Sequence, residues 1–261
     1  MRTVCIMNLK GGTAKTVTAI NLAAILARDY AQRVLLVDAD SQANLTEFVV
    51  GGPADDGTPG GLSDLLRGLE AFPLPTTIPN VKILIGDSRL MDLDVSMVNA
   101  HAVEPLVLSD WLETVADRFD WAVIDCPPAF SAAAMTALIA ADEVIIPMKV
   151  DSFGMRGISN MMNQIRNMRR INPELEIAGV LPTMTYPDKT QNEKLAELRG
   201  VLAQYHVRTF NSIRRSALVD RSTFSQEALI TASPKSKCLF DYRVFVSRLI
   251  GDSIDEEGGE I

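Results

Sequence analysis

A glycine-rich segment near the start of the chain constrains the fold more than any other feature. It reads Lys10-Gly11-Gly12-Thr13-Ala14-Lys15-Thr16 and lies between an apolar run (residues 4–7) and a helical pattern (residues 19–27). A strand, a glycine turn and a helix that opens with Lys-Thr form the layout of a phosphate-binding loop. In such a loop the backbone N–H groups and the helix N-terminus hold the phosphates. Lys15 would then reach the outer phosphates, and the Thr16 hydroxyl would bind Mg²⁺.

Apolar, β-branched runs alternate with helical patterns along the rest of the chain. This alternation indicates parallel strands joined by right-handed helical crossovers, in a sheet that is buried on both faces. The predicted strands are 3–7, 33–37, 81–85, 121–125, 143–148, 177–181 and 207–210. The predicted helices are 16–28, 62–67, 106–116, 132–140, 157–170, 191–204 and 242–250. We therefore expect an α/β fold with a doubly wound, mostly parallel β-sheet that helices flank on both faces. Residues 1–251 would form a single P-loop domain, followed by an acidic, disordered tail at 252–261.

Composition limits the cellular compartments in which this chain is expected. The chain has 261 residues, of which 47% are hydrophobic, enough for a full core in one domain. It contains no run of eighteen apolar residues, and its first residues read as a strand rather than as a leader peptide. The three cysteines lack the spacing of a metal site or a disulfide framework, which fits a reducing compartment. These features predict a cytoplasmic protein that does not enter the membrane.

Three carboxylates stand where predicted strands end. Asp38 and Asp40 follow the second strand, and Asp125 closes the strand at 121–125. Because ligands of open α/β sheets bind outside the carboxyl ends of the strands, these acids should converge on the nucleotide. Asp125 is placed to hold Mg²⁺, usually through water, with Asp38 in support. Asp40, farther along, would orient or deprotonate the attacking water.

Charge is unevenly distributed. The net charge of −8 argues against a chain-wide nucleic-acid coat, yet the stretch from Tyr205 to Ile250 holds eight basic residues against three acidic ones. Two interpretations stay open: a DNA-binding surface, or scattered solvated charges that share no face. The candidates for DNA contact are Arg208, Arg214, Arg215, Arg221, Lys235 and Lys237.

Four motifs together resemble the ParA/Soj family of partition ATPases. The segment NLKGGxxKT at 8–16 resembles the family's deviant phosphate loop, and VDADSQANLT at 37–46 resembles its second motif, commonly VDxDPQGNxT. The segment IDCPP at 124–128 resembles its Walker B motif. The segment GVLPTM at 179–184 is similar to its late strand beside the nucleotide base. The likeness covers most of the chain and weakens after about residue 205.

The resemblance implies a homodimer that forms with ATP and Mg²⁺, binds DNA non-specifically on the nucleoid and hydrolyses ATP when a ParB-like, centromere-bound partner stimulates it. Lys10 matches the signature lysine, which crosses the dimer interface to the partner's nucleotide. Lys15 matches the phosphate-binding lysine, Thr16 the Mg²⁺ ligand and Asp40 the residue tied to hydrolysis. The residues expected at the nucleotide are Lys10, Gly11, Gly12, Thr13, Ala14, Lys15, Thr16, Val17, Thr183 and Met184, with Thr16, Asp38 and Asp125 at the metal.

Three positions depart from the family pattern. Ala14 replaces a glycine, Val17 replaces a second Thr or Ser, and Ser41 replaces a proline. If position 14 needs a positive φ, alanine costs about 1 kcal/mol there. The missing hydroxyl at position 17 removes a charge-assisted hydrogen bond worth about 1.5–3 kcal/mol. Because Lys10 and Asp40 are retained, we expect an active but slow ATPase with weakened nucleotide affinity.

Other functions remain open on the sequence alone. A MinD-like positioning ATPase would need a basic amphipathic C-terminal helix to lie on a membrane, whereas residues 242–250 read as a packed helix and the chain ends acidic. A metabolic P-loop ligase would turn over ATP only with its small-molecule substrate. A nucleotide-gated DNA-binding switch with little hydrolysis is the third alternative. The sequence does not distinguish a plasmid, chromosome or mobile element as cargo.

Overall fold

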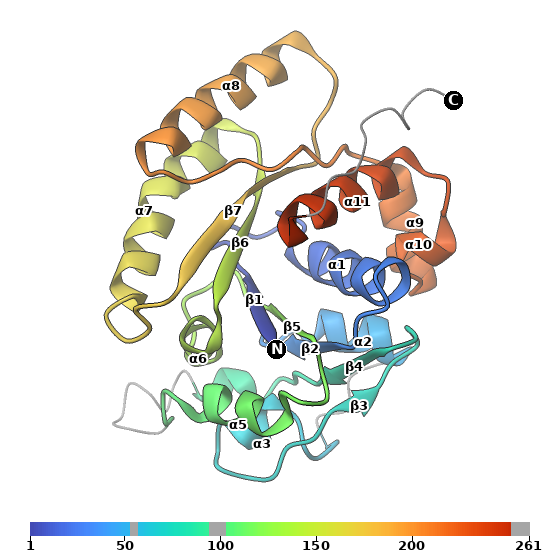
Figure 1. Ribbon diagram of the computed structural model, residues 1–261, viewed down its shortest axis with the longest axis vertical. Helices are drawn as coiled ribbons and strands as arrows, with labels where there is room; N and C mark the ends of the chain where they lie inside the picture. Colours follow the sequence, from blue (N-terminus) through green and yellow to red (C-terminus); the bar gives the residue numbers. More distant parts are fainter. Residues whose placement is uncertain (53–56, 94–102, 252–261) are drawn as a thin grey trace.

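The computed structural model describes residues 1–52, 57–93 and 103–251, and for residues 152–156 the backbone alone. Strands and helices alternate through most of this part of the chain (Figure 1). The strands are β1 (Arg2–Ile6), β2 (Val34–Asp38), β3 (Leu74–Pro75), β4 (Val81–Leu84), β5 (Trp121–Asp125), β6 (Glu143–Lys149) and β7 (Glu176–Thr183). The helices are α1 (Lys15–Asp29), α2 (Asn44–Val50), α3 (Leu62–Leu65), α5 (Val107–Val115), α6 (Ala132–Ala140), α7 (Ser152–Met168), α8 (Lys189–Gln204), α9 (Ala217–Ser225), α10 (Leu229–Ala232) and α11 (Lys237–Ile250). None of these helices is long and apolar enough to span a membrane.

The strands form a seven-stranded sheet in the order β3-β4-β2-β5-β1-β6-β7. All neighbouring pairs are parallel except β3 with β4. The predicted doubly wound, mostly parallel fold is therefore confirmed. Strand β1 lies between β5 and β6, so the loop that follows β1 opens at the middle of the sheet's carboxyl edge.

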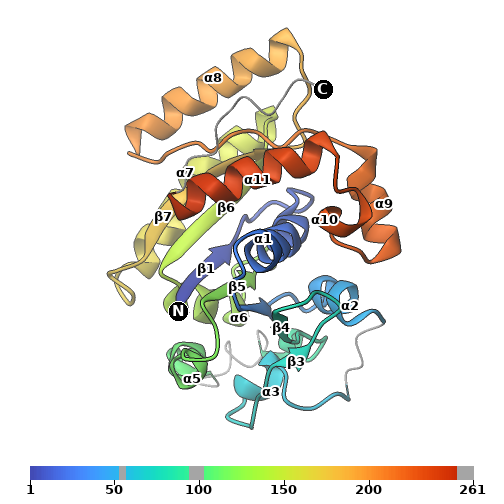
Figure 2. The same ribbon diagram turned by 45° about the vertical axis from the view of Figure 1, so that its right-hand side comes forward.

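Each face of the sheet has its own hydrophobic core. Helices α1, α2, α10 and α11 cover one face, whereas α3, α5, α6, α7 and α8 pack on the other (Figures 1 and 2). Successive strand residues alternate between the two cores: Cys5 points into the second and Ile6 into the first, both fully buried. Helix α1 is buried along most of its length because it packs on the central strands and beneath α11. This packing fixes the N-terminus of α1, where the phosphate loop ends.

Some predicted elements were wrong. Residues 207–210 do not form a strand but meet β7 in an isolated bridge between Val180 and Thr209, with a second bridge between Thr185 and Arg214. Both bridges are parallel, so the segment runs alongside β7, but the pairing is interrupted between them and no regular strand forms. The Phe210 ring packs against Phe245, with ring centroids 4.9 Å apart. Strand β3 and helices α2, α9 and α10 were not predicted. The predicted tail at 252–261 lies outside the described residues.

Candidate nucleotide-binding site

The loop between β1 and α1 is braced by side chains of neighbouring strands. Asn8 accepts a hydrogen bond from the Lys10 amide at 2.9 Å and donates one to the Pro147 carbonyl at 2.7 Å. The Thr183 hydroxyl donates to the Thr13 carbonyl at 3.1 Å. These bonds tie the loop to β6 and β7, so its free backbone N–H groups are held in place before any ligand arrives.

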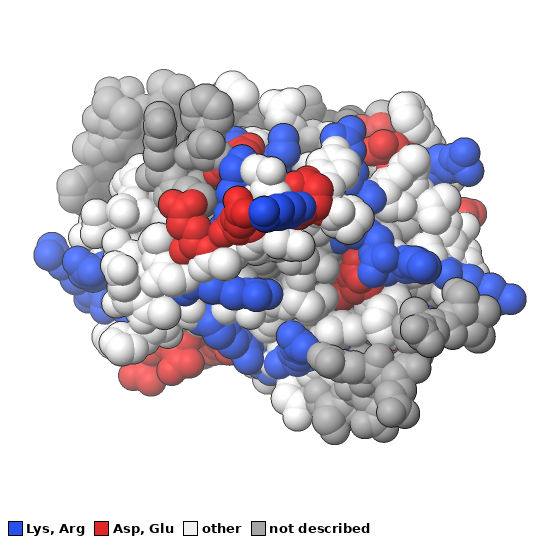
Figure 3. Space-filling view, turned by 90° about the horizontal axis from the view of Figure 1, so that it is seen from above, with Lys and Arg blue, Asp and Glu red and all other residues white. Residues whose placement is uncertain are grey.

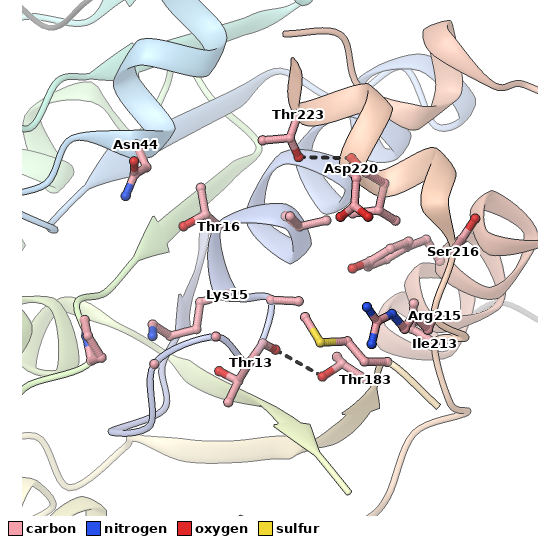
Figure 4. Close-up of a pocket in the computed structure, with 18 of the residues that line it drawn as sticks. Thr13, Lys15, Thr16, Asn44, Thr183, Ile213, Arg215, Ser216, Asp220 and Thr223 are labelled. Carbon is pink, nitrogen blue, oxygen red and sulfur yellow. Dashed lines mark hydrogen bonds between the residues drawn. The ribbon is translucent and has the colours of Figure 1, made fainter. Parts of the chain in front are cut away.

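The loop forms one wall of a cavity of about 530 Å³. Of the ten residues expected at the nucleotide, all but Lys10 line it, including Thr183 and Met184 at the end of β7. In Figure 4, Lys15 and Thr16 lie on one side of the cavity and Arg215 and Ser216 on the opposite side. A cavity of this size, with Lys15 on one side and Arg215 on the other, suits a nucleotide whose phosphates face Lys15 and whose base lies toward Arg215.

The far wall was missed by the sequence analysis. It comes from α9 and the segment before it, and its lining residues are Ile213, Arg214, Arg215, Ser216, Val219, Asp220 and Thr223. The sequence does carry one signal for the start of α9. Ser216 caps α9, since its hydroxyl accepts a hydrogen bond from the Leu218 amide at 3.2 Å. A serine directly before such an apolar pair is a typical helix start.

Lys15 is a buried cation at the centre of this site. Burial lowers its pKa, while the charges of Asp125 and Asp40 act in the opposite direction. The ammonium therefore faces two carboxylates from different strand ends. This arrangement keeps a positive charge where phosphate oxygens would arrive.

Asp38 and Asp125 are neighbours in register on β2 and β5, and both are buried. Burial raises the pKa of Asp38 to about 6, and hydrogen bonds from Thr46 and from the Asp40 amide offset part of that rise. Burial, together with the charge of Asp38, raises the pKa of Asp125 well above its ordinary value, against which the Thr16 hydroxyl acts. Two adjacent buried carboxylates favour a bound cation.

The two carboxylates differ in what occupies their oxygens. Asp38 Oδ2 accepts from the amide and the hydroxyl of Thr46, both at 2.8 Å, and Oδ1 accepts from the Asp40 amide at 3.2 Å. Asp125 Oδ1 is buried and has no hydrogen-bond partner among the described residues. An orphaned carboxylate oxygen near the Thr16 hydroxyl fits Mg²⁺, which is usually held by one or two carboxylates, a hydroxyl, waters and phosphate oxygens. The described residues contain no cluster of three or more His, Cys, Asp or Glu that would form an all-protein cage.

Lys10 does not line the cavity. Its Nζ lies 2.9 Å from both carboxylate oxygens of Asp151, which follows β6. About a third of the Lys10 side chain is exposed. Within one chain this lysine is thus held at the rim of the site, paired with an acid.

Ala14 adopts the left-handed conformation, with φ 67° and ψ 33°. The positive φ assumed in the sequence analysis is present, so an alanine Cβ strains this position. We expect Ala14→Gly to raise the free energy of unfolding by about 1 kcal/mol, because relief of left-handed strain exceeds the freedom that glycine adds to the unfolded chain. For a chain of this size the melting temperature should rise by about 2–4 °C. Thermal unfolding measures this shift in the melting temperature. Titration with Mg-ATP measures whether the affinity for the nucleotide changes with it.

Ala43 is the matched control for that substitution. It also caps a helix in the left-handed conformation, with φ 51°, but it does not line the cavity. Ala43→Gly should therefore stabilise the fold to a similar degree and leave Mg-ATP affinity unchanged. A fall in the melting temperature of Ala14→Gly would contradict the strain argument.

The six candidate DNA contacts have different local environments. Arg208 donates from Nε to the Ala178 carbonyl and lies 4.5 Å over the Phe210 ring. Arg214 is paired with Asp241 through two bonds of 2.7 Å. Arg215 lines the cavity and contacts the Tyr186 hydroxyl. The other three candidates are exposed and have no ion pair within the described part of the chain: Arg221, Lys235 and Lys237. On the face in Figure 3, basic side chains are interspersed with acidic ones.

Comparison with known proteins agrees with this geometry. Residues 1–177 match the family model described as an AAA domain. The chain is 30% identical to the chromosome partitioning protein ParA of Caulobacter vibrioides over 238 residues, which covers 88% of this chain and 87% of that protein. It is 35% identical to the ParA protein of Myxococcus xanthus over 187 residues, 70% of this chain and 65% of that protein.

A solved structure with bound ADP and magnesium shares the fold. It is the cobyrinic acid a,c-diamide synthase of Mycobacterium smegmatis, with a TM-score of 0.80 and 27% sequence identity over 96% of this chain and 94% of that one. The partitioning proteins match this chain at higher sequence identity, 30% and 35%, than the diamide synthase does. This chain belongs to the ParA/Soj family of P-loop ATPases.

Proposed function

We propose that this protein is an ATP-driven DNA-partitioning switch. It forms a homodimer with Mg-ATP, binds DNA non-specifically on the nucleoid and hydrolyses ATP slowly until a ParB-like partner stimulates it. The observation that carries the proposal is the pairing of a preformed phosphate loop with a lysine, Lys10, that lies at the rim of its own site. A cation at the rim is placed to serve a nucleotide held by a second copy.

The residues divide the chemistry among them. The loop amides and Lys15 would bind the phosphates, and Thr16 with Asp125 would hold Mg²⁺, Asp125 usually through water. When bound, the metal neutralises charge on the β- and γ-phosphates. Asp40, which lines the cavity, would orient or deprotonate the attacking water. Lys10 of the partner subunit would supply positive charge as the phosphoryl group leaves.

Retention on non-specific duplex DNA with ATP, ADP or no nucleotide tests the proposal. Retention with Mg-ATP alone, weakened by salt, is the expected result. Sedimentation in the same three states should show a dimer only with Mg-ATP. Failure to bind Mg-ATP at millimolar concentration would reject the proposed ATP-driven function altogether.

A small-molecule ligase is the second candidate, favoured by the likeness to the diamide synthase. That function predicts no retention on DNA in any nucleotide state. It also predicts that turnover starts only when a small carboxylic acid is supplied. The retention experiment therefore separates the two functions without knowledge of the small molecule.

We propose Arg221, Lys235 and Lys237 as the DNA surface, because all three side chains are exposed and lie outside the ion pairs of the described part of the chain. Leu218, one turn before Arg221 on α9, lines the same surface hollow as Lys235 and as Ser236, which precedes Lys237. This shared hollow supports treating the three charges as one candidate surface. Alanine at all three positions should weaken DNA binding about tenfold at physiological salt. It should also flatten the salt dependence by about three counterions. Binding isotherms at several salt concentrations measure both effects.

Arg214→Ala is the matched control. Because Arg214 is paired with buried Asp241, its loss should lower the melting temperature and leave the salt dependence of DNA binding unchanged. If this variant flattens the salt dependence at an unchanged melting temperature, Arg214 belongs to the DNA surface.

A further inference from the structure

Thr46, in the first turn of α2, joins three segments that meet at the edge of the sheet. Its side chain is buried, at 3% exposure. The hydroxyl donates to Asp38 Oδ2 at 2.8 Å and accepts from the Gly86 amide at 3.0 Å, just beyond β4. The Thr46 amide donates to the same Asp38 oxygen. One hydroxyl thus links the end of β2, the start of α2 and the end of β4.

Asp38 connects Thr46 to the backbone of Asp40 through hydrogen bonds. The second oxygen of Asp38 accepts from the Asp40 amide at 3.2 Å, so the Asp38 carboxylate lies between Thr46 and the backbone of Asp40. Asp40 in turn accepts from the Gln42 amide at 3.0 Å and lines the nucleotide cavity. A chain of hydrogen bonds therefore runs from Thr46 to the residue expected to act on the attacking water.

Gly86 packs closely against the backbone of this turn. A Cβ at position 86 would lie 2.6 Å from the Asp38 carbonyl oxygen and 3.1 Å from the Asp40 carbonyl oxygen. Both contacts are with backbone atoms, which cannot swing aside as a flexible side chain does. The backbone at Asp38–Asp40 is thus restrained by close packing against Gly86 as well as by the Thr46–Asp38 bonds.

From this geometry we propose that Thr46 is a positioning residue for hydrolysis: through Asp38 it sets the place of Asp40 at the γ-phosphate end of the cavity. The proposal rests on the proposed ATPase function. It assigns Asp38 a structural task, because both of its oxygens already accept hydrogen bonds, and leaves the metal to Asp125. The effect should appear in the chemical step rather than in nucleotide binding, since none of these bonds involves the loop that holds the phosphates.

The test compares Thr46→Val with Thr46→Ser. Valine keeps the shape but leaves the Gly86 amide and one Asp38 lone pair unsatisfied, whereas serine keeps the hydroxyl. Thr46→Val should lower kcat for ATP about tenfold, since small misplacements of catalytic groups are costly, with the Kd for a non-hydrolysable Mg-ATP analogue within about threefold of the wild type. Thr46→Ser should retain wild-type kcat within about threefold.

Two further variants keep the test decisive. Gly86→Ala leaves the hydroxyl intact but crowds the Asp40 backbone, so it should lower kcat selectively even if Thr46→Val proves too unstable to assay. Thr136→Val removes another buried hydroxyl, one that bonds the Ala133 carbonyl inside α6, and should leave kcat unchanged.

The outcomes separate this inference from the proposed function. Wild-type protein that neither binds nor hydrolyses Mg-ATP rejects the proposed function. Wild-type turnover with unchanged kcat in Thr46→Val and Gly86→Ala rejects the positioning role alone. An equal loss of kcat in Thr46→Ser and Thr46→Val also rejects it, because the hydroxyl would then be irrelevant.

Discussion

Lys10→Gln should lower ATP turnover about 10³-fold or more while Mg-ATP binding stays within a few-fold of the wild type. The reason is positional: Lys10 lies outside the cavity, paired with Asp151, so it contributes little to binding within its own chain. A cation delivered to the phosphoryl group from outside the site is worth about 10³–10⁵ in rate. Steady-state turnover and titration with a non-hydrolysable analogue measure the two quantities separately.

Mixing two inactive variants shows which subunit Lys10 serves. In a mixed dimer of Lys10→Gln and Asp40→Asn, one site combines an intact Asp40 with an intact Lys10 from the partner subunit. Turnover should therefore reappear on mixing. If Lys10 acts within its own chain, no site in the mixture is complete and turnover stays absent.

Asp151→Asn is the matched variant for that experiment. It releases the Lys10 side chain without removing its charge, so turnover should hold or rise modestly. The pair is about one third exposed, and its loss should cost little stability. A collapse of turnover in Asp151→Asn equal to that in Lys10→Gln would mean that the ion pair, rather than the charge of Lys10 alone, supports catalysis.

The central part of the fold follows from local sequence patterns. Continuous apolar runs correctly predicted β1, β2, β5 and β6, because strands that are buried on both faces consist almost entirely of apolar residues. Strand β3 is two residues long and ends in proline at the sheet edge, so its sequence holds no period to detect. Helix α9 was missed for a related reason: Ser222 is its sole buried residue, and an apolar stripe is absent.

The candidate site was predictable where spacing along the chain carries the information. The loop residues and the acids at strand ends converge because topology alone brings them to one edge. The basic residues gave no such signal, because their roles depend on partners far along the chain. Asp241 neutralises Arg214 from 27 positions away, which no local pattern reveals. The different duties of Asp38 and Asp125 likewise depend on Thr46, which reaches one carboxylate and not the other.

Asp125→Asn should weaken Mg-dependent ATP binding by about 10- to 100-fold, the usual effect of losing a group that supports a bound metal. The same substitution should stabilise the nucleotide-free protein at neutral pH. Burial raises the pKa of Asp125, so the folded state binds its proton more tightly than the unfolded chain does. The contribution of Asp125 to stability therefore falls as the pH rises above 3.8, and the neutral amide removes that contribution to the pH dependence.

Asp38→Asn provides the opposite case on the neighbouring strand. Asp38 is equally buried, but both of its oxygens accept hydrogen bonds, from Thr46 and from the Asp40 amide. In Asp38→Asn the side-chain NH2 group would replace one of these acceptors and face a hydrogen-bond donor. This variant should melt below the wild type, whereas Asp125→Asn melts above it without nucleotide and gains less from Mg-ATP. Melting curves from pH 4 to 8, with and without Mg-ATP, measure all three proteins. If both substitutions lower the melting temperature alike, the orphaned oxygen of Asp125 is not the metal-facing group, and the division of labour between the two carboxylates fails.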